Sequence, residues 1–172
     1  MPAFDLHPLS ESLIYQVAML ARSCDRREIG ACQPGGYDPA GLAAEMAEAC
    51  AHGFVATADG VPVAVVGLCP VMPGVFSAGM FATDQWADIA FSVTKFIRTI
   101  FIPERRAEGM RRMEARSIDG HPLSGHWLEH LGFVREATCP DFGMRRETFH
   151  LYAWRASDHG GANVPGAGGA HV

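Results

Sequence analysis

The stretch from Met80 to Phe133 constrains the fold of this chain more than any other part of its sequence. It predicts the end of a strand, a long helix over about Asp84–Ile102, a second strand over Met110–Ile118 and a short second helix. Pro103 should kink or end the long helix, because proline lacks the N–H group that a helix interior requires. This alternation of strands and helices within one stretch indicates a mixed α/β domain.

The short helix is expected from about Pro122, with Asp119 as a possible cap. An apolar stripe predicts its buried face, and its members are Leu123, Trp127 and Leu131. Gly132 then stands where a glycine commonly ends a helix.

The N-terminal part predicts a short strand at Phe4–Leu9 and a helix capped by Ser10, which should fade near Asp25–Glu28. Asp38, followed by proline, predicts the cap of another helix, and Gly53 its end. Two further runs, 54–58 and 61–69, are rich in β-forming residues. Only an Asp-Gly pair separates them, which is typical of a tight β-hairpin.

The C-terminal part predicts a strand at Val75–Thr83 and a final antiparallel pair at Phe133–Thr138 and Arg146–Trp154. An edge strand at Thr148–Trp154 could pair with another copy of the chain. Residues 1–155 should form a single domain. Residues 156–172 are rich in glycine and should be a linker, a disordered end or an arm held by a partner.

Composition narrows the possible partners and compartments. The 172 residues carry a net charge of −5, which argues against nucleic acid as the main partner. The five cysteines, an odd number without a C-x-x-C pair, fit free thiols in a reducing compartment. The N-terminus shows no signal peptide, and the apolar runs are too short to span a membrane, so we expect no secretion by signal peptide and no membrane partner.

The segment His126–His130 matches the H-x-x-E-H pattern of inverted zinc peptidases. A third metal ligand is required, usually a downstream glutamate, and the only glutamates that follow are Glu136 and Glu147, both in or beside predicted strands. The predicted apolar stripe also turns both histidines toward solvent. We therefore expect no metal site, and we interpret Cys69 as a small core residue rather than a nucleophile.

The order of elements, with a short helix closing in Leu131-Gly132-Phe133, is similar to that of the GNAT acyltransferase superfamily over about residues 4–155. The resemblance implies an α/β fold, more strictly α+β, with a central, mostly antiparallel sheet of six or seven strands flanked by about four helices. A closer resemblance is to the GNAT-like internal virion proteins of short-tailed phages. It covers about residues 74–155 and is carried by the turn Phe81–Gln85 and the segment Leu128–Gly132.

The resemblance also implies where acetyl-CoA would bind if the chain is an active enzyme. Its pyrophosphate would lie on the backbone of Thr83, Asp84, Gln85 and Trp86, at the turn that opens the long helix. This turn lacks the glycines that let a backbone approach phosphate. Thr83 and Asp84 are the expected caps of the helix. We expect Asp84 to consume the N–H groups that a phosphate needs, and Asp84 and Asp88 to repel a diphosphate.

The resemblance places the tyrosine that protonates the departing thiolate at Leu128, which cannot donate a proton. Tyr152 and His126 are the candidate substitutes if the chain is active. No base for the amine is evident in Val75–Phe81.

These replacements favour a non-catalytic GNAT-like domain without a cofactor. It would be a structural component of a tailed-phage or prophage virion, acting in the virion or host cytoplasm through other virion proteins or copies of itself. The alternative is an acyl-CoA-dependent N-acetyltransferase with a divergent cofactor turn, and a third possibility is an acyl-CoA sensor. An enzyme requires an open V-shaped gap between the strands at 75–81 and 110–118, whereas a structural component could fill that gap with Trp86 or Phe81.

Overall fold

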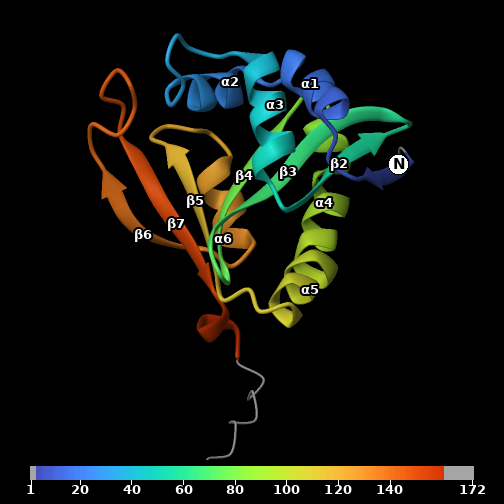
Figure 1. Cartoon of the computed structure of the whole chain (residues 1–172), viewed down its shortest axis with the longest axis vertical. Coiled ribbons are helices and arrows are strands. Elements are labelled where there is room, and N and C mark those ends of the chain that lie inside the picture. The colour runs from blue at the N-terminus through green and yellow to red at the C-terminus, as the bar shows by residue number, and fades with distance from the viewer. Residues whose placement is uncertain (1–2, 161–172) are drawn as a thin grey trace, which may run out of the picture.

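A computed structural model describes residues 3–160 of the chain. They form one seven-stranded sheet with helices packed against it (Figure 1). The strands are β1 (Phe4–His7), β2 (His52–Ala58), β3 (Val61–Met72), β4 (Val75–Ala82), β5 (Arg112–Ile118), β6 (Val134–Cys139) and β7 (Phe149–Arg155). Their order is β1-β2-β3-β4-β5-β7-β6, and neighbours are antiparallel except for the parallel pair β4 and β5. The expected mostly antiparallel sheet is therefore confirmed.

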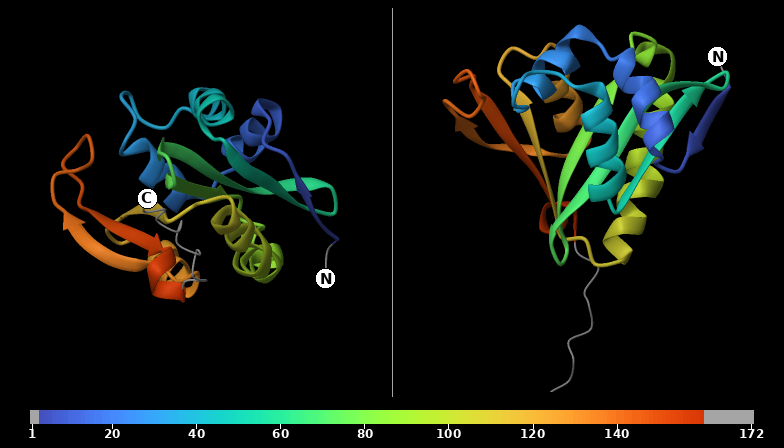
Figure 2. Two further views of the ribbon diagram at one scale, coloured as in Figure 1. Left: turned by 60° about the horizontal axis from the view of Figure 1, so that its bottom comes forward. Right: turned by 45° about the horizontal axis from the view of Figure 1, so that its top comes forward.

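Helices cover both faces of this sheet. They are α1 (Glu11–Met19), α2 (Ser23–Gly30), α3 (Pro39–Ala49), α4 (Trp86–Phe96), α5 (Ile102–Ala107) and α6 (Ser124–His130). Figure 2, in its left view, shows α1 and α3 on one side of the central strands and α4 with α5 on the other. Val65 and Phe81 pack with α1 and α3, whereas Val66 and Ala82 belong to the core under α4 and α6. Successive side chains of β3 and β4 point to opposite faces, so these strands serve both cores.

Local chemistry explains where several elements begin and turn. Ser10 and Asp38 each accept a hydrogen bond from a backbone N–H in the first turn of the helix that follows, so both predicted caps are confirmed. Asp59 and Gly60, which link β2 to β3, have φ angles of 48° and 79°. The predicted hairpin is confirmed, because such a two-residue link needs positive φ at both positions.

Helix α2 departs from the prediction that the first helix fades near Asp25–Glu28. Instead, α1 ends at Met19, Ala21 pairs with Thr83 beyond β4, and a new helix begins at Ser23. The sequence of α2 is charged and has no apolar stripe, so no local pattern predicts it. Its contacts are with the distant ends of two strands, as described below.

The helix after β4 continues past Pro103, where we expect a kink or an end. It passes from α4 through a π-helical turn at Ile97–Phe101 into α5, which ends at Ala107. Pro103 lies in the first turn of α5. The missing N–H of a proline is tolerated there because the wider π turn precedes it.

The buried face of α6 matches the predicted stripe only in part. Leu131 is 7% exposed and Trp127 is partly buried against the core, as predicted. Leu123 is instead 48% exposed, and Leu128, at 7%, packs in the core. Asp119 does not cap this helix, because Nδ1 of His121 accepts the hydrogen bonds from the first N–H groups instead. Gly132, with a φ angle of 92°, ends the helix as predicted.

Strand β7 lies inside the sheet, between β5 and β6. The predicted free edge at Thr148–Trp154 is therefore wrong, because both sides of β7 are already paired. Among the described strands, β1 and β6 form the two edges of the sheet.

The predicted boundary near residue 155 stays a prediction. A short 3-10 helix, Ala156–His159, follows β7, and most of the glycine-rich segment predicted as a tail lies outside the described residues. Within residues 3–160, none of the helices is long and apolar enough to cross a membrane.

We expect Gly53→Ala to destabilise the protein. An added Cβ would lie 2.3 Å from the carbonyl oxygen of Val66 and 3.0 Å from Cα of Gly67, and the φ angle of Gly53 is 154°. The free energy of unfolding should fall by more than about 1 kcal/mol, measured by urea denaturation. Gly79→Ala is the matched control, because nothing lies within 4 Å of its added Cβ. Equal losses in the two variants would contradict this account.

Candidate functional site

Strands β4 and β5 separate after a short parallel pairing. Their register joins Val75–Ser77 to Arg112–Glu114 and ends there. A cavity of about 290 Å³ lies where the strands diverge. Its walls include β4 from Ser77 to Phe81, Met113 and Ala115 of β5, and side chains of both helix layers. The cavity therefore reaches through the sheet from the α4/α6 side to the α2/α3 side.

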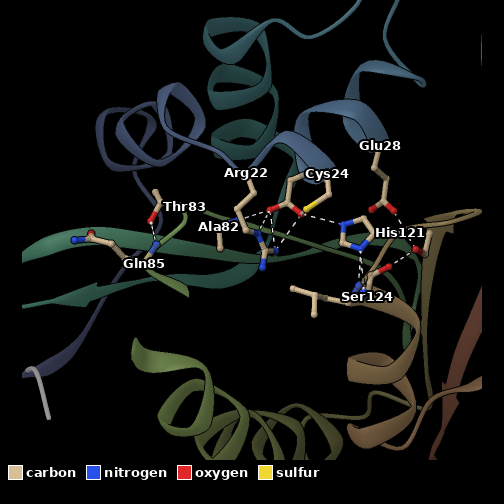
Figure 3. Close-up of polar contacts among 11 residues, drawn as sticks. Arg22, Cys24, Glu28, Ala82, Thr83, Gln85, His121 and Ser124 are labelled. Atoms are coloured by element: carbon tan, nitrogen blue, oxygen red, sulfur yellow. Dashed lines mark hydrogen bonds and ion pairs between the residues drawn. The ribbon is translucent and has the colours of Figure 1, made fainter. Parts of the chain in front are cut away.

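Two carboxylates of α2 bridge the diverging strands (Figure 3). Asp25 Oδ2 accepts a hydrogen bond from the N–H of Ala82, at the end of β4, at 2.8 Å. Glu28 Oε2 accepts one from the N–H of Ile118, at the end of β5, at 2.8 Å, and one from the hydroxyl of Ser117 at 3.0 Å. Helix α2 therefore supplies hydrogen-bond acceptors to strand ends that no longer pair with each other.

Asp25 is also bound by Arg22 and His121. Nε and Nη2 of Arg22 donate to its carboxylate at 2.9 and 3.0 Å, and Nε2 of His121 lies 3.1 Å from Oδ1. The three side chains are between 2% and 10% exposed. Burial raises the pKa of Asp25, but the hydrogen bonds from His121, Ala82 and Arg22 outweigh it and hold that pKa below its usual range. Arg22 and Asp25 are therefore a buried ion pair.

The ring of His121 is fixed in one tautomer. Its Nδ1 accepts hydrogen bonds from the N–H groups of Leu123 and Ser124 at 3.2 and 3.0 Å, so the proton is on Nε2 and is donated to Asp25. Cys24, Asp25 and His121 do place possible ligand atoms within 4.8 Å of one another. A metal ion would need the Nε2 lone pair, which the proton occupies. We therefore interpret this cluster as a hydrogen-bonded network and not as a metal site.

Glu28 is a partly buried carboxylate that lines the cavity. Burial raises the pKa of Glu28 above its usual range, although the hydrogen bonds from Ile118 and Ser117 oppose this effect. A carboxylate with a raised pKa is a better proton acceptor near neutral pH than an ordinary one. Glu28 is therefore the strongest candidate for a general base in the cavity.

Of the two caps predicted at the turn between β4 and α4, Thr83 bonds to the residue directly before the helix and Asp84 does not act as a cap. Thr83 Oγ1 accepts a hydrogen bond from the N–H of Gln85 at 3.3 Å, whereas Asp84 is exposed and, within residues 3–160, caps no N–H group of α4. The N–H groups of Thr83 and Trp86 are bonded to the carbonyl oxygens of Val63 and Thr83. Three of the four predicted phosphate-binding N–H groups are therefore engaged, but Asp84 does not consume them.

Two tryptophans narrow the cavity between α4 and α6. The rings of Trp86 and Trp127 meet edge to face, with centroids 5.6 Å apart, and both residues line the cavity. Trp127 Nε1 donates to Thr94 Oγ1 at 2.9 Å, which fixes its ring. The predicted filling of the gap by Trp86 is thus partial, because the cavity persists beside it.

Neither predicted candidate acid reaches this cavity. The side chain of His126 is 94% exposed on α6, where its nearest charged partner is Glu129. Tyr152 is buried, but its hydroxyl lies against Gly125. Neither His126 nor Tyr152 is among the described residues that line the cavity. Leu128, at the position that the resemblance assigns to a tyrosine, does line it.

The network of Arg22, Asp25, Glu28 and His121 has no counterpart in the sequence prediction. One signal was present: Arg22, Asp25 and Glu28 recur every three residues, which places them on one side of a helix. Nothing local points to His121, which joins the network from the loop between β5 and α6.

No protein-family model matches the chain, and no curated protein matches it in sequence. Solved structures do match. The ribosomal-protein-S18-alanine N-acetyltransferase of Escherichia coli is similar with a TM-score of 0.66 and 13% identity, over 89% of this chain and 94% of that one. A probable GNAT-family acetyltransferase of Chromobacterium violaceum gives a TM-score of 0.68 and 16% identity, over 92% and 91%.

A third similar structure is yncA, a putative acetyltransferase of Salmonella typhimurium with its cofactor acetyl-CoA. It matches with a TM-score of 0.61 and 13% identity, over 94% of this chain and 99% of that one. The chain therefore has the GNAT fold, as predicted. The expected closer resemblance to internal virion proteins of short-tailed phages, and the virion role that it implied, find no support in these comparisons.

Proposed function

We propose that this GNAT-fold chain is an acyl-CoA-dependent N-acyltransferase that binds its thioester cofactor, acetyl-CoA or a relative, between β4 and β5. The observation that supports the proposal is the cavity where these two strands diverge, open to both helix layers. A thioester can enter such a gap from one face of the sheet and an amine from the other. This replaces the structural role expected from the sequence, which rested on the turn without glycines, the leucine in place of the tyrosine and the missing base.

The backbone of β4 offers a donor for the thioester carbonyl. The N–H and C=O of Ala82 bond to Asp25 and to the N–H of Arg22, away from β3. Because successive residues of a strand alternate, the N–H of Met80 points to the same side, and pairing with β5 has already ended at Ser77. A backbone N–H in this position can stabilise the negative charge that develops on a carbonyl oxygen under attack.

Glu28 can accept the proton of the attacking amine. The amine nitrogen forms a bond to the thioester carbon, the C–S bond breaks, and the proton passes from nitrogen to Glu28. A thiol has a pKa of about 8.5, so coenzyme A can leave as a thiolate without an acid at Leu128. The replacement of the expected tyrosine therefore does not exclude acyl transfer.

Binding of acetyl-CoA tests the proposal most directly. Isothermal titration calorimetry should give a Kd on the order of 1–100 µM, in the range of typical enzyme substrates. An acceptor screen with primary amines would then follow. Absence of binding at millimolar acetyl-CoA would overturn the proposal and return attention to a non-catalytic role through protein contacts.

We expect Gly79→Leu to weaken acetyl-CoA binding without unfolding the protein. Gly79 is an exposed β4 residue in the cavity wall, and an added Cβ meets nothing within 4 Å. A leucine side chain can therefore occupy the gap without a backbone clash. Binding should weaken at least about tenfold by calorimetry, while Gly79→Ala should bind nearly as the wild type does. Unchanged binding in Gly79→Leu would place the ligand outside the cavity.

A further inference from the structure

Arg22 presents a buried donor that finds no acceptor among the residues that the structure describes. Its Nε and Nη2 bind Asp25, but its Nη1 is buried and has no hydrogen-bond partner within residues 3–160. The residue is 9% exposed, lines the cavity and lies with its guanidinium 5.9 Å from the ring centre of Trp86. Figure 3 shows its end directed from the α2 side toward the space above α4. Few buried donors in native proteins lack a partner, so an acceptor on a ligand would complete this one.

The surrounding charge favours a neutral acceptor. The positive charge of Arg22 is already balanced by Asp25, and His121 is held in its neutral tautomer. Asp84 and Asp88 stand at the start of α4, where they repel phosphate. The N–H groups of that turn are mostly engaged as well. An uncharged carbonyl oxygen therefore suits Nη1 better than a diphosphate oxygen does.

The position of Arg22 beside β4 indicates which part of a bound thioester cofactor would supply the carbonyl oxygen. The N–H groups of Met80 and Ala82 point to the same side of β4, away from β3. The N–H of Ala82 already donates to Asp25, so a ligand that lies along this side of β4 can bond to the N–H of Met80 but not to that of Ala82. Arg22 adjoins Ala82, because its own N–H bonds to the Ala82 carbonyl at 2.9 Å. Its side chain can therefore offer a donor in place of the one that Asp25 has taken.

We propose that Nη1 of Arg22 fixes the pantetheine arm of the bound thioester by donating a hydrogen bond to an amide carbonyl oxygen of that arm. The inference rests on the proposed acyl-CoA binding. Arg22 is a positioning residue in this account, and it selects for ligands with an amide chain next to the thiol. The same guanidinium binds Asp25. Cofactor binding is therefore coupled to the hydrogen-bonded network of α2, which bridges the ends of β4 and β5.

The test is the Arg22→Lys variant, titrated by calorimetry with pantetheine, coenzyme A and inorganic diphosphate. Lysine retains the charge beside Asp25 but has no second nitrogen to aim at the cavity. We expect the Kd values of pantetheine and coenzyme A to rise by similar factors of about ten or more. Arg146→Lys is the matched control, because Arg146 also holds an aspartate through two nitrogens but is exposed and is not among the described residues that line the cavity, and it should leave both values unchanged.

Equal affinities in wild type and Arg22→Lys would overturn the inference while leaving the proposed function intact. A loss for coenzyme A and diphosphate but not for pantetheine would assign Arg22 to phosphate and overturn it too. No binding of pantetheine or coenzyme A by the wild type would overturn both proposals. NMR of the wild-type arginine side chains provides a second measurement that needs no variant. The Arg22 guanidinium signal should shift when pantetheine is added, and an unmoved signal counts against the contact.

Discussion

Asp25→Asn is expected to lower the free energy of unfolding by about 3–5 kcal/mol, because it removes one partner of a buried ion pair and leaves Arg22 uncompensated. The side chains of Arg22 and Asp25 are only 10% and 4% exposed. Asp25 also accepts hydrogen bonds from His121 and from the N–H of Ala82, and an amide cannot satisfy all of these donors. Urea denaturation with a two-state fit would measure the loss.

The matched control is Asp141→Asn. Asp141 pairs with Arg146 in the same bidentate manner, but these side chains are 60% and 80% exposed. Surface pairs contribute between about 0 and 1 kcal/mol, so this variant should unfold almost as the wild type does. If Asp25→Asn costs no more than Asp141→Asn, then the buried network does not hold α2 to the strands.

The loss in Asp25→Asn should also depend on pH. The pKa of Asp25 in the folded state lies below its ordinary value of 3.8, so its carboxylate stabilises the fold at pH values above 3.8. This stabilisation disappears as the pH falls through the lower, folded-state pKa. Denaturation curves of wild type and variant should therefore converge in acid and stay apart from neutral pH down to about pH 4.

Glu28→Gln is expected to reduce kcat by a factor of about 10² to 10⁴, the usual contribution of a general base. Glutamine keeps an oxygen for the N–H of Ile118 and the hydroxyl of Ser117 but cannot accept the amine proton. Binding of acetyl-CoA should stay within about twofold of wild type, because this carboxylate contacts the amine and not the cofactor. Steady-state kinetics with an identified acceptor, combined with calorimetry, would separate the two effects.

Stability provides an internal check on this variant. The pKa of Glu28 is raised by burial, so its contribution to stability is present below its ordinary value of 4.5 and is lost as the pH rises through the folded-state pKa. Replacing it with a neutral amide should therefore not weaken the fold at neutral pH. Glu129→Gln, on the exposed side of α6, is the activity control. Undiminished kcat in Glu28→Gln would remove Glu28 from the mechanism.

The order of elements followed from the sequence because the signals that set it are local. The cap at Ser10, the proline after Asp38, the Asp59-Gly60 link and the glycine at 132 each act within one turn of chain. Alternating and helical apolar patterns then identified the strands and the long helix. The order of elements that these patterns predict resembles that of the GNAT superfamily, and that resemblance implied the mostly antiparallel sheet and the fold that the structure has.

Local patterns failed where a distant contact decides the structure. Helix α2 has no apolar stripe and is held by carboxylates whose strand partners lie 57 and 90 residues away, at Ala82 and Ile118. The buried face of α6 likewise depends on the core beneath it, which takes Leu128 and leaves Leu123 in solvent. A periodicity of 3.6 residues indicates that a helix has a buried face, but neighbouring elements select the residues that occupy it.

The sequence by itself thus determined the order of elements, and the family resemblance built on that order implied the scaffold and a tyrosine at the position that Leu128 occupies. Only the tertiary structure decided that β4 and β5 diverge around a cavity and that Asp25 and Glu28 span the opening. It alone showed that Nη1 of Arg22, a residue that lines the cavity, is buried without a hydrogen-bond partner among residues 3–160. The physical reason is that burial, charge pairing and pKa depend on which groups meet in space, and residues far apart in the chain supply them.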